Sequence, residues 1–294
     1  MNFDGWLLFE ISLAGLGTGG LYALTALAFV MVYKSTKVVN IAIGEMLMIG
    51  AYLFLAFSST LMLPIWLAIP LSLLASALTG GLIERTLIRP MLGESPISSL
   101  MVTVGMSFIL IGLVELIWTA DQQRLPELFP TKPILIGEAF VSSKIFYGFG
   151  IALMLIAIVL VTFRYWRGGV ALRATASDQA AAYSVGINVP KVFSLSWMLA
   201  GAIAGVAGIV VGSIGGVSSA MGVFGLSVLV VVIFGGLDSV LGALVGGLVV
   251  GWLEALAGFY LGGEYKIVAT FGLLVLILMV RPYGLFGTHE IERL

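Results

Sequence analysis

The sequence predicts an all-α protein, a polytopic bundle of eight or nine transmembrane helices. Apolar residues make up 60% of the 294 positions and charged residues only 10%. The mean hydropathy of +1.15 lies far outside the range of soluble domains. The apolar residues also gather in runs of about 20, the length that a helix needs to cross a bilayer. We therefore expect a single transmembrane domain over residues 1–294.

Composition excludes several classes of chemistry. The chain has no cysteine, and its single histidine, His289, lies in the C-terminal tail. Disulfides, thiol catalysis and imidazole chemistry inside the membrane are therefore excluded. The sequence also lacks the phosphate-binding loop of nucleotide hydrolases and the HExxH motif of zinc peptidases. We expect no catalytic residue, no metal site and no cofactor in this chain.

Four apolar runs form the first part of the chain. The first contains four closely spaced glycines, which let a neighbouring helix approach and can also make room for a substrate. The third contains Pro70, which removes one backbone hydrogen bond from a helix. The fourth carries Glu115 in its last turns, near Trp118, as is typical of the membrane interface. The expected spans are residues 6–33, 40–57, 63–83 and 100–118.

A polar segment separates the fourth span from the fifth. Residues 121–144 contain three prolines and charges of both signs without helical periodicity, so we expect the main external loop here. Residues 145–163 then form a fifth span, which returns the chain to the cytoplasm. This span leads into the longest polar interruption with helical character.

That interruption covers residues 164–191. Residues 170–185 are rich in alanine and other helix formers, and Gly186, Asn188 and Pro190 follow as a helix stop. A short helix is therefore expected outside the membrane. It is either a solvated connector or a helix that docks into a groove on a soluble partner.

The remaining spans include one short run. Residues 192–212 and 240–261 are glycine-rich, and residues 266–280 form the last run. Residues 223–236 would measure only about 21 Å as a helix, which is short of a full crossing. This run is either a tilted short span or half of a broken helix. Broken helices occur where the backbone is buried in protein or lines a cavity, so the run is a pathway candidate.

Basic residues predict the orientation of the chain. With the N-terminus outside and the C-terminus in the cytoplasm, ten basic residues fall inside and four outside, in keeping with the positive-inside rule. The count holds only if residues 223–236 cross or one neighbouring span is miscounted, which leaves eight or nine spans. The inside set is Lys34, Lys37, Arg85, Arg89, Arg164, Arg167, Arg173, Lys191, Arg281 and Arg293, and the outside set is Arg124, Lys132, Lys144 and Lys266.

Polar residues within the apolar runs mark candidate sites. Asn40, Gly44 and Glu45 fall at or just inside the cytoplasmic end of the second span, and Glu254 lies within residues 240–261. A carboxylate at membrane depth is costly without a partner or water, which makes it a functional candidate. The alternative is a structural role, because polar residues also cap helices and hold membrane helices together.

Two classes of function follow from the residues alone. One is a permease subunit that a separate motor drives through the cytoplasmic helix. The other is a self-contained secondary transporter or channel that uses the membrane carboxylates. A membrane enzyme acting on lipid has no supporting motif.

Six stretches of the sequence, taken in order, point to one family. They are LYALTALAFVMVY (21–33), NIAIGE (40–45), the turn with Glu84, Arg85, Arg89 and Pro90, ALRATASDQAAAYSVGIN (171–188), GGLDSVLGALVGGLVVGWLE (235–254) and RPYGLFG (281–287). Together they resemble the membrane permease subunits of ATP-binding-cassette importers for branched-chain amino acids. The resemblance extends from about residue 15 to residue 287.

Three positions depart from the pattern of that family. Ile41 and Ile43 interrupt the second stretch, and Asp238 stands where glycine is more usual. Position 43 is polar in the family, so isoleucine removes a hydrogen-bonding group next to Gly44 and Glu45. The resemblance therefore implies a cargo of branched-chain amino acids or a related small polar solute such as an amide, urea or a small carboxylate.

The resemblance also implies a complex in the bacterial inner membrane. A second, related permease subunit completes a heterodimer, two cytoplasmic ATPase subunits hydrolyse ATP, and a periplasmic binding protein delivers the substrate. Residues 164–191 become the coupling loop, whose expected ATPase contacts are Arg173, Asp178, Ala182 and Gly186. The expected translocation pathway contains Asn40, Gly44, Glu45 and Glu254.

Overall fold

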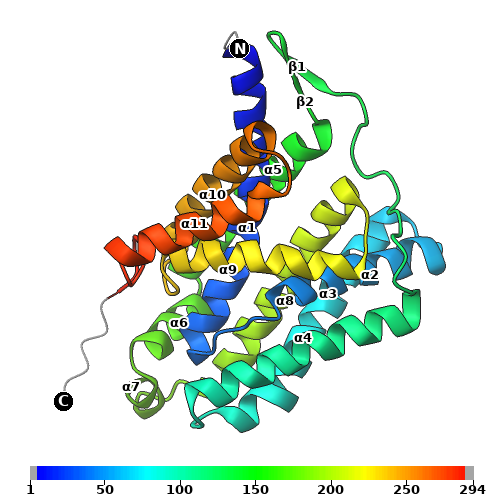
Figure 1. Cartoon of the computed structure of the whole chain (residues 1–294). Helices are drawn as coiled ribbons and strands as arrows, with labels where there is room; N and C mark the ends of the chain where they lie inside the picture. The colour runs from blue at the N-terminus through cyan, green and yellow to red at the C-terminus, as the bar shows by residue number, and fades with distance from the viewer. Residues whose placement is uncertain (1–4, 289–294) are drawn as a thin grey trace. The chain divides into compact units, whose positions relative to one another are not determined.

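The structure, a computed structural model, describes residues 5–288 and confirms the all-α architecture (Figure 1). His289 and Arg293 lie outside this range. Within it, seven helices are long and apolar enough to cross a membrane, and two shorter apolar helical segments cover Ser219–Gly235 and Tyr265–Val280. The chain is therefore a multi-pass membrane protein.

The first four spans agree with the expected ranges to within a few residues. Ser95 caps the fourth with its hydroxyl, and Pro96 occupies its first turn. Pro70 lies inside the third helix, which continues on both sides of it. The elements are α1 (Gly5–Thr36), α2 (Ile43–Leu55) with a π-helical extension η1 (Ala56–Thr60), α3 (Ile65–Ile83) with extensions η2 (Glu84–Ile88) and η3 (Arg89–Met91), and α4 (Pro96–Trp118).

The polar segment over residues 121–144 contains a small hairpin and leads into the remaining helices. Strands β1 (Ile134–Ile136) and β2 (Ala139–Val141) pair in antiparallel register. The expected short run is confirmed as a helix of 12 residues, α9. The elements that follow the hairpin are α5 (Ser143–Tyr165), α6 (Arg167–Ser177), α7 (Gln179–Ser184), α8 (Val189–Gly215), η4 (Ser219–Val223), α9 (Phe224–Gly235), α10 (Val240–Tyr260) and α11 (Tyr265–Val280).

The chain divides into two compact units. Unit 1 comprises Met1–Ala26, Phe129–Leu153 and Ser227–Leu294, and unit 2 comprises Leu27–Leu128 and Met154–Leu226. Three helices, α1, α5 and α9, begin in one unit and end in the other.

Unit 2 is built around α8, which packs on α2 and α3 through glycines. A methyl group built on Gly50 of α2 would lie 2.3 Å from the Cα atom of Gly205 in α8. A methyl group on Gly80 of α3 would lie 2.3 Å from the carbonyl oxygen of Trp197, whose side chain is fully buried. The three backbones therefore approach as closely as small residues permit.

Unit 1 pairs the first half of α1 with α10 in the same way. A methyl group on Gly251 would lie 2.4 Å from the Cα atom of Gly19, and one on Gly15 would lie 2.9 Å from the Cα atom of Trp252. The expected role of these glycines in close helix packing is confirmed. Helices α10 and α11 also pack together in this unit (Figure 1).

The RPYGLFG stretch closes the C-terminal end of α9. The backbone N–H groups of Leu285 and Phe286 donate to the carbonyl oxygens of Phe234 and Gly235, at 2.9 and 3.0 Å. Gly284 makes the turn with a φ of 77°. The tail thereby satisfies carbonyl groups that the last turn of a helix leaves unpaired.

Candidate functional site

The polar loop over residues 164–191 folds as two helices, α6 and α7, instead of the single helix expected over residues 170–185. Asp178 breaks the run because its backbone is extended, with φ −155° and ψ 114°. Its side chain accepts a hydrogen bond from the backbone N–H of Ala181 at 3.0 Å and so caps α7. Aspartate competes with the helix for backbone donors, and here that competition decides the break. The single-helix expectation was wrong at this residue.

Gly186 ends α7 in a left-handed turn, as the sequence predicted. Its φ is 88°, a conformation that glycine adopts without steric cost. The N–H of Gly186 donates to the carbonyl of Tyr183, and the N–H of Ile187 donates to that of Ala182, both at 3.0 Å. This bond pattern is a Schellman motif. The side chain of Asn188 then caps α8 through the N–H of Lys191.

Ala182 points into the protein, while two neighbours point outward. Ala182 is 3% exposed and belongs to an apolar cluster with Val189 and Phe193 of α8. Tyr183 and Val185 are 73% and 75% exposed. Exposed apolar side chains in a polar loop favour the docking interpretation over a solvated connector. Sequence reasoning missed both residues, although a tyrosine and a valine beside a run of alanines was the available signal.

Arg173 is held within the chain. Its guanidinium donates to the carbonyl oxygen of Phe163, and also to that of Arg164 at 3.4 Å. These carbonyls belong to the last turn of α5, where a cation is favourably placed. The bonds fix α6 against α5, which gives Arg173 a structural role. Its expected contact with an ATPase stays a prediction.

In unit 2, Gly44 and Glu45 meet η4 and the start of α9, while Asn40 lies buried just before α2. Asn40 is fully buried, and its amide oxygen accepts from the N–H of Ala42 at 3.1 Å at the start of α2. A methyl group on Gly44 would lie 2.4 Å from the carbonyl oxygen of Gly222 and 2.8 Å from the Cα atom of Gly225. The first turn of α2 is therefore in backbone contact with η4 and the start of α9.

Glu45 fills the space that Gly222 leaves open. Its side chain is 6% exposed, and a methyl group on Gly222 would lie 2.7 Å from its Oε1 atom. Ser107 of α4 is the side chain that interacts with the carboxyl group. Two short or interrupted helices thus meet at a buried carboxyl, an arrangement typical of substrate sites at membrane depth. Sequence reasoning had named both segments but had not paired them.

Glu254 lies in unit 1, where three hydroxyl groups surround it. Tyr22 of α1 donates to its Oε2 atom at 2.6 Å, and Ser227 and Thr270 donate to Oε1 at 3.0 and 2.7 Å. The carboxyl group joins α1, α9, α10 and α11. This bonding gives Glu254 the structural role that the sequence left open as an alternative. The three hydroxyl residues carried no sequence signal, because isolated Tyr, Ser and Thr are ordinary in membrane helices.

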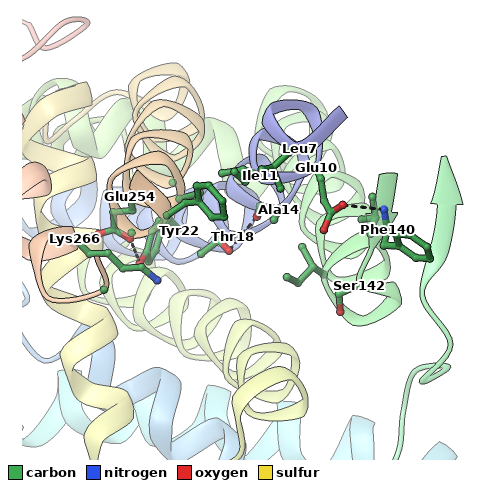
Figure 2. Close-up of a pocket in the computed structure, with 17 residues that line it drawn as sticks. Leu7, Glu10, Ile11, Ala14, Thr18, Tyr22, Phe140, Ser142, Glu254 and Lys266 are labelled. Atoms are coloured by element: carbon green, nitrogen blue, oxygen red, sulfur yellow. Dashed lines mark hydrogen bonds between the residues drawn. The ribbon is translucent and has the colours of Figure 1, made fainter. Parts of the chain in front are cut away.

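A cavity of about 660 Å³ opens beside this cluster in unit 1 (Figure 2). Figure 2 shows Tyr22 and Glu254 at one end and Glu10 at the other, where Glu10 accepts from the N–H of Phe140 at 3.1 Å. Lys266 of α11 also lines the cavity, and most of the remaining lining is apolar. Glu254 therefore contributes to a cavity wall as well as to the contacts between helices.

Comparisons with known proteins cover nearly the whole chain. A family described as the permease component of the branched-chain amino acid transport system matches residues 11–280. The chain is 34% identical to the high-affinity branched-chain amino acid transport system permease protein LivH of Salmonella typhimurium, over 95% of each chain. It is 32% identical to the corresponding protein BraD of Pseudomonas aeruginosa, again over 95% of each.

A more distant relative and one solved structure extend these similarities. The probable branched-chain amino acid transport permease protein LivH of Methanocaldococcus jannaschii is 29% identical, over 91% of this chain and 89% of that one. The structure of PsaBC from Streptococcus pneumoniae in complex with Fab resembles the fold with a TM-score of 0.51, at 12% identity and 95% coverage of both chains. The family match and the identities settle the relationship: the chain belongs to the family of branched-chain amino acid transport permease components.

Proposed function

We propose that the chain is the membrane-spanning subunit of an ATP-driven importer for branched-chain amino acids or a related small polar solute. It acts as one permease domain in the plasma membrane of a bacterium, with the N-terminus outside, the C-terminus in the cytoplasm and eight or nine spans. The observation that carries the proposal is the family match over residues 11–280, which includes both the coupling loop and the junction of α2 with α9.

The coupling element supports a drive by separate ATPase subunits. Helices α6 and α7 present Tyr183 and Val185 to the solvent, and Ala182 anchors α7 to the start of α8. In this proposal the exposed pair enters a groove on the ATPase, while Arg173, Asp178 and Gly186 hold the element in shape. The ATPase must bind two permease conformations with different affinity, since only a differential interaction can shift their populations.

The junction between α2 and α9 supports a pathway in unit 2. Asn40, Gly44 and Glu45 line it, and the second permease subunit supplies the facing wall. A buried carboxyl beside helix starts offers polar contacts to a zwitterionic amino acid in an otherwise apolar environment. Glu254 of unit 1 supports the pathway indirectly in this scheme, because its hydrogen bonds with Ser227 and Thr270 hold α9 and α11 to α10.

Family membership does not favour the alternative of a self-contained secondary transporter. A purification experiment distinguishes the two hypotheses. The tagged chain is purified in mild detergent from its native host, and its companions are identified by mass spectrometry. We expect a second permease, two ATPase subunits and a periplasmic binding protein.

Transport is then measured with the purified complex in proteoliposomes. ATP and the loaded binding protein should both be required for uptake of labelled leucine, isoleucine or valine, with amides and urea as competitors. Uptake by the chain alone, driven by an ion gradient without ATP, would contradict the proposal.

A further inference from the structure

The turn at the end of α3 contains an ion pair between a buried carboxylate, Glu84, and a partly exposed guanidinium, Arg89. Glu84 is fully buried, and Arg89 binds it through two bonds, Nε to Oε1 at 3.0 Å and Nη2 to Oε2 at 2.9 Å. The pair lies within η2 and the start of η3, which continue α3 without a break. Bidentate pairing fixes the orientation of both side chains as well as their charge.

Ser194 of α8 joins this pair to a second helix. Its hydroxyl donates to Oε2 of Glu84 at 2.8 Å and accepts from Nη2 of Arg89 at 2.6 Å. The same Nη2 donates to the carbonyl oxygen of Pro190 at 3.3 Å, in the first turn of α8. Glu84, Arg89 and Ser194, here called the α3–α8 clamp, thus tie the end of α3 to the beginning of α8.

The first turn of α8, which the clamp ties to α3, is also the turn against which α7 packs. Gly186 and Ile187 end α7, and α8 begins two residues later at Val189. Val189 and Phe193 pack against Ala182 of α7. Ser194 follows Phe193 directly in the sequence. A displacement of α7 therefore reaches α8 at the turn that the clamp fixes to α3.

Beyond the clamp, α3 and α8 stay in backbone contact. Gly80 of α3 rests on the carbonyl of Trp197, one turn from Ser194. Farther along, α8 meets α2 at Gly208, where a methyl group would lie 2.0 Å from the carbonyl of Leu47. Because α2 begins at the buried Glu45 junction, a continuous packed route in unit 2 leads from α7 to the proposed pathway.

We propose that the α3–α8 clamp passes movement of the coupling helices to the transmembrane helices. Without it, α8 could tilt at its first turn while α3 stayed behind, and the movement would be lost near the cytoplasmic surface. Glu84, Arg89 and Ser194 are positioning residues in this inference, since they act through α3 and α8. With Arg89 partly exposed, the ion pair is weak support for stability, but its bidentate geometry is well suited to fixing register between two elements. The inference rests on the proposed function, specifically on an ATPase that grips α6 and α7.

The test uses the complete transporter in proteoliposomes with its binding protein. Ser194→Ala removes the hydroxyl that links the two helices but leaves the ion pair, and Arg89→Lys keeps the charge but loses the bidentate geometry. Arg85→Gln is the matched control, since Arg85 is an exposed cation in the same turn. Uptake and ATP hydrolysis are measured on the same vesicles, together with subunit stoichiometry and melting temperature.

We expect both clamp variants to assemble normally and to hydrolyse ATP, with uptake per ATP reduced about two- to ten-fold, the range of one lost hydrogen bond. Arg85→Gln should keep the wild-type ratio. A parallel loss of uptake and hydrolysis, or an unchanged ratio in both clamp variants, would overturn the inference.

Tyr183→Ala separates this inference from the proposed function. If Tyr183→Ala impairs ATPase binding while the clamp variants transport normally, only the clamp inference fails. If Tyr183→Ala changes neither ATPase binding nor hydrolysis, the docking of α7 fails and the clamp inference fails with it.

Discussion

Because Gly44 has no side chain, the first turn of α2 can approach η4 and the start of α9 closely within unit 2. A methyl group there would lie 2.4 Å from the carbonyl oxygen of Gly222 and 2.8 Å from both the Cα and the N atom of Gly225. All three contacts involve main-chain atoms, which cannot rotate away as a side chain would. The sequence drew attention to Gly44 as a candidate pathway residue. The structure shows a steric reason for glycine at this position.

Gly44→Ala should therefore force α2 away from α9. We expect a loss of about 1–3 kcal/mol in stability, the usual cost of overpacking, and a marked fall in uptake. Gly105→Ala in α4 is the control, since no atom lies within 4 Å of a methyl group there. Thermal unfolding of the purified complex and leucine uptake are the measurements. Equal behaviour of the two variants would contradict the close approach.

Tyr22 should matter for stability more than for selectivity. Its hydroxyl donates to Glu254 at 2.6 Å in a buried cluster, so Tyr22→Phe leaves one acceptor position of that carboxyl unpaired. We expect a loss of about 1–3 kcal/mol in the free energy of unfolding. Tyr260→Phe, at an exposed tyrosine near the end of α10, serves as the control. A change in substrate preference without loss of stability would place Glu254 in the pathway instead.

At the level of secondary structure, the shape of the α6–α7 pair depends on two boundary residues, Asp178 and Gly186. Asp178 separates the helices by capping α7, and Gly186 ends α7 in a left-handed turn. Composition predicted the helical region and its end, because alanine and glycine carry strong local preferences. It did not predict the break, since aspartate is tolerated both inside a helix and at its start.

Gly186→Val should uncouple ATP hydrolysis from uptake. Valine at a φ of 88° is strained by about 1–3 kcal/mol, so the turn should relax and change the angle between α7 and α8. We expect ATP hydrolysis to persist while leucine uptake falls. The control is Gly150→Val in α5, where a methyl group would meet nothing within 4 Å. Normal uptake by Gly186→Val would argue against a role for this turn in coupling.

For the whole molecule, the absence of cysteine allows a direct test of orientation. Single-cysteine variants at Tyr183, which is 73% exposed, and at Leu135 of the hairpin, which is 63% exposed, each carry one reactive thiol. A membrane-impermeant maleimide should label Leu135→Cys in intact spheroplasts and Tyr183→Cys only in inverted vesicles. Labelling of both from one side would contradict the proposed topology.

The same reagent tests the docking surface. Added ATPase subunits should slow the labelling of Tyr183→Cys in inverted vesicles that contain the chain alone. The rate for a cysteine at Glu94, an exposed residue in the turn before α4, serves as the reference. Equal rates with and without the ATPase would contradict contact at α7.

The sequence by itself determined the membrane class, the approximate limits of the spans, the short run at residues 223–236 and the helix stop at Gly186. These features follow from hydropathy over about 20 residues and from local backbone preferences, both of which are written in consecutive positions. The family resemblance could be seen for the same reason, because its motifs are short and occur in order.

Only the tertiary structure decided which polar residues meet. Glu45 faces Gly222, Glu254 collects the hydroxyls of Tyr22, Ser227 and Thr270, and Ser194 completes the ion pair of Glu84. Three of these contacts, Glu45 with Gly222, Tyr22 with Glu254 and Ser194 with Glu84, join residues more than a hundred positions apart. Ser227 and Thr270 lie 27 and 16 positions from Glu254, but on different helices of nearly uniform apolarity. Hydropathy can place such helices in a membrane, but it does not fix their rotation or their neighbours, which depend on close packing of glycines and on buried hydrogen bonds.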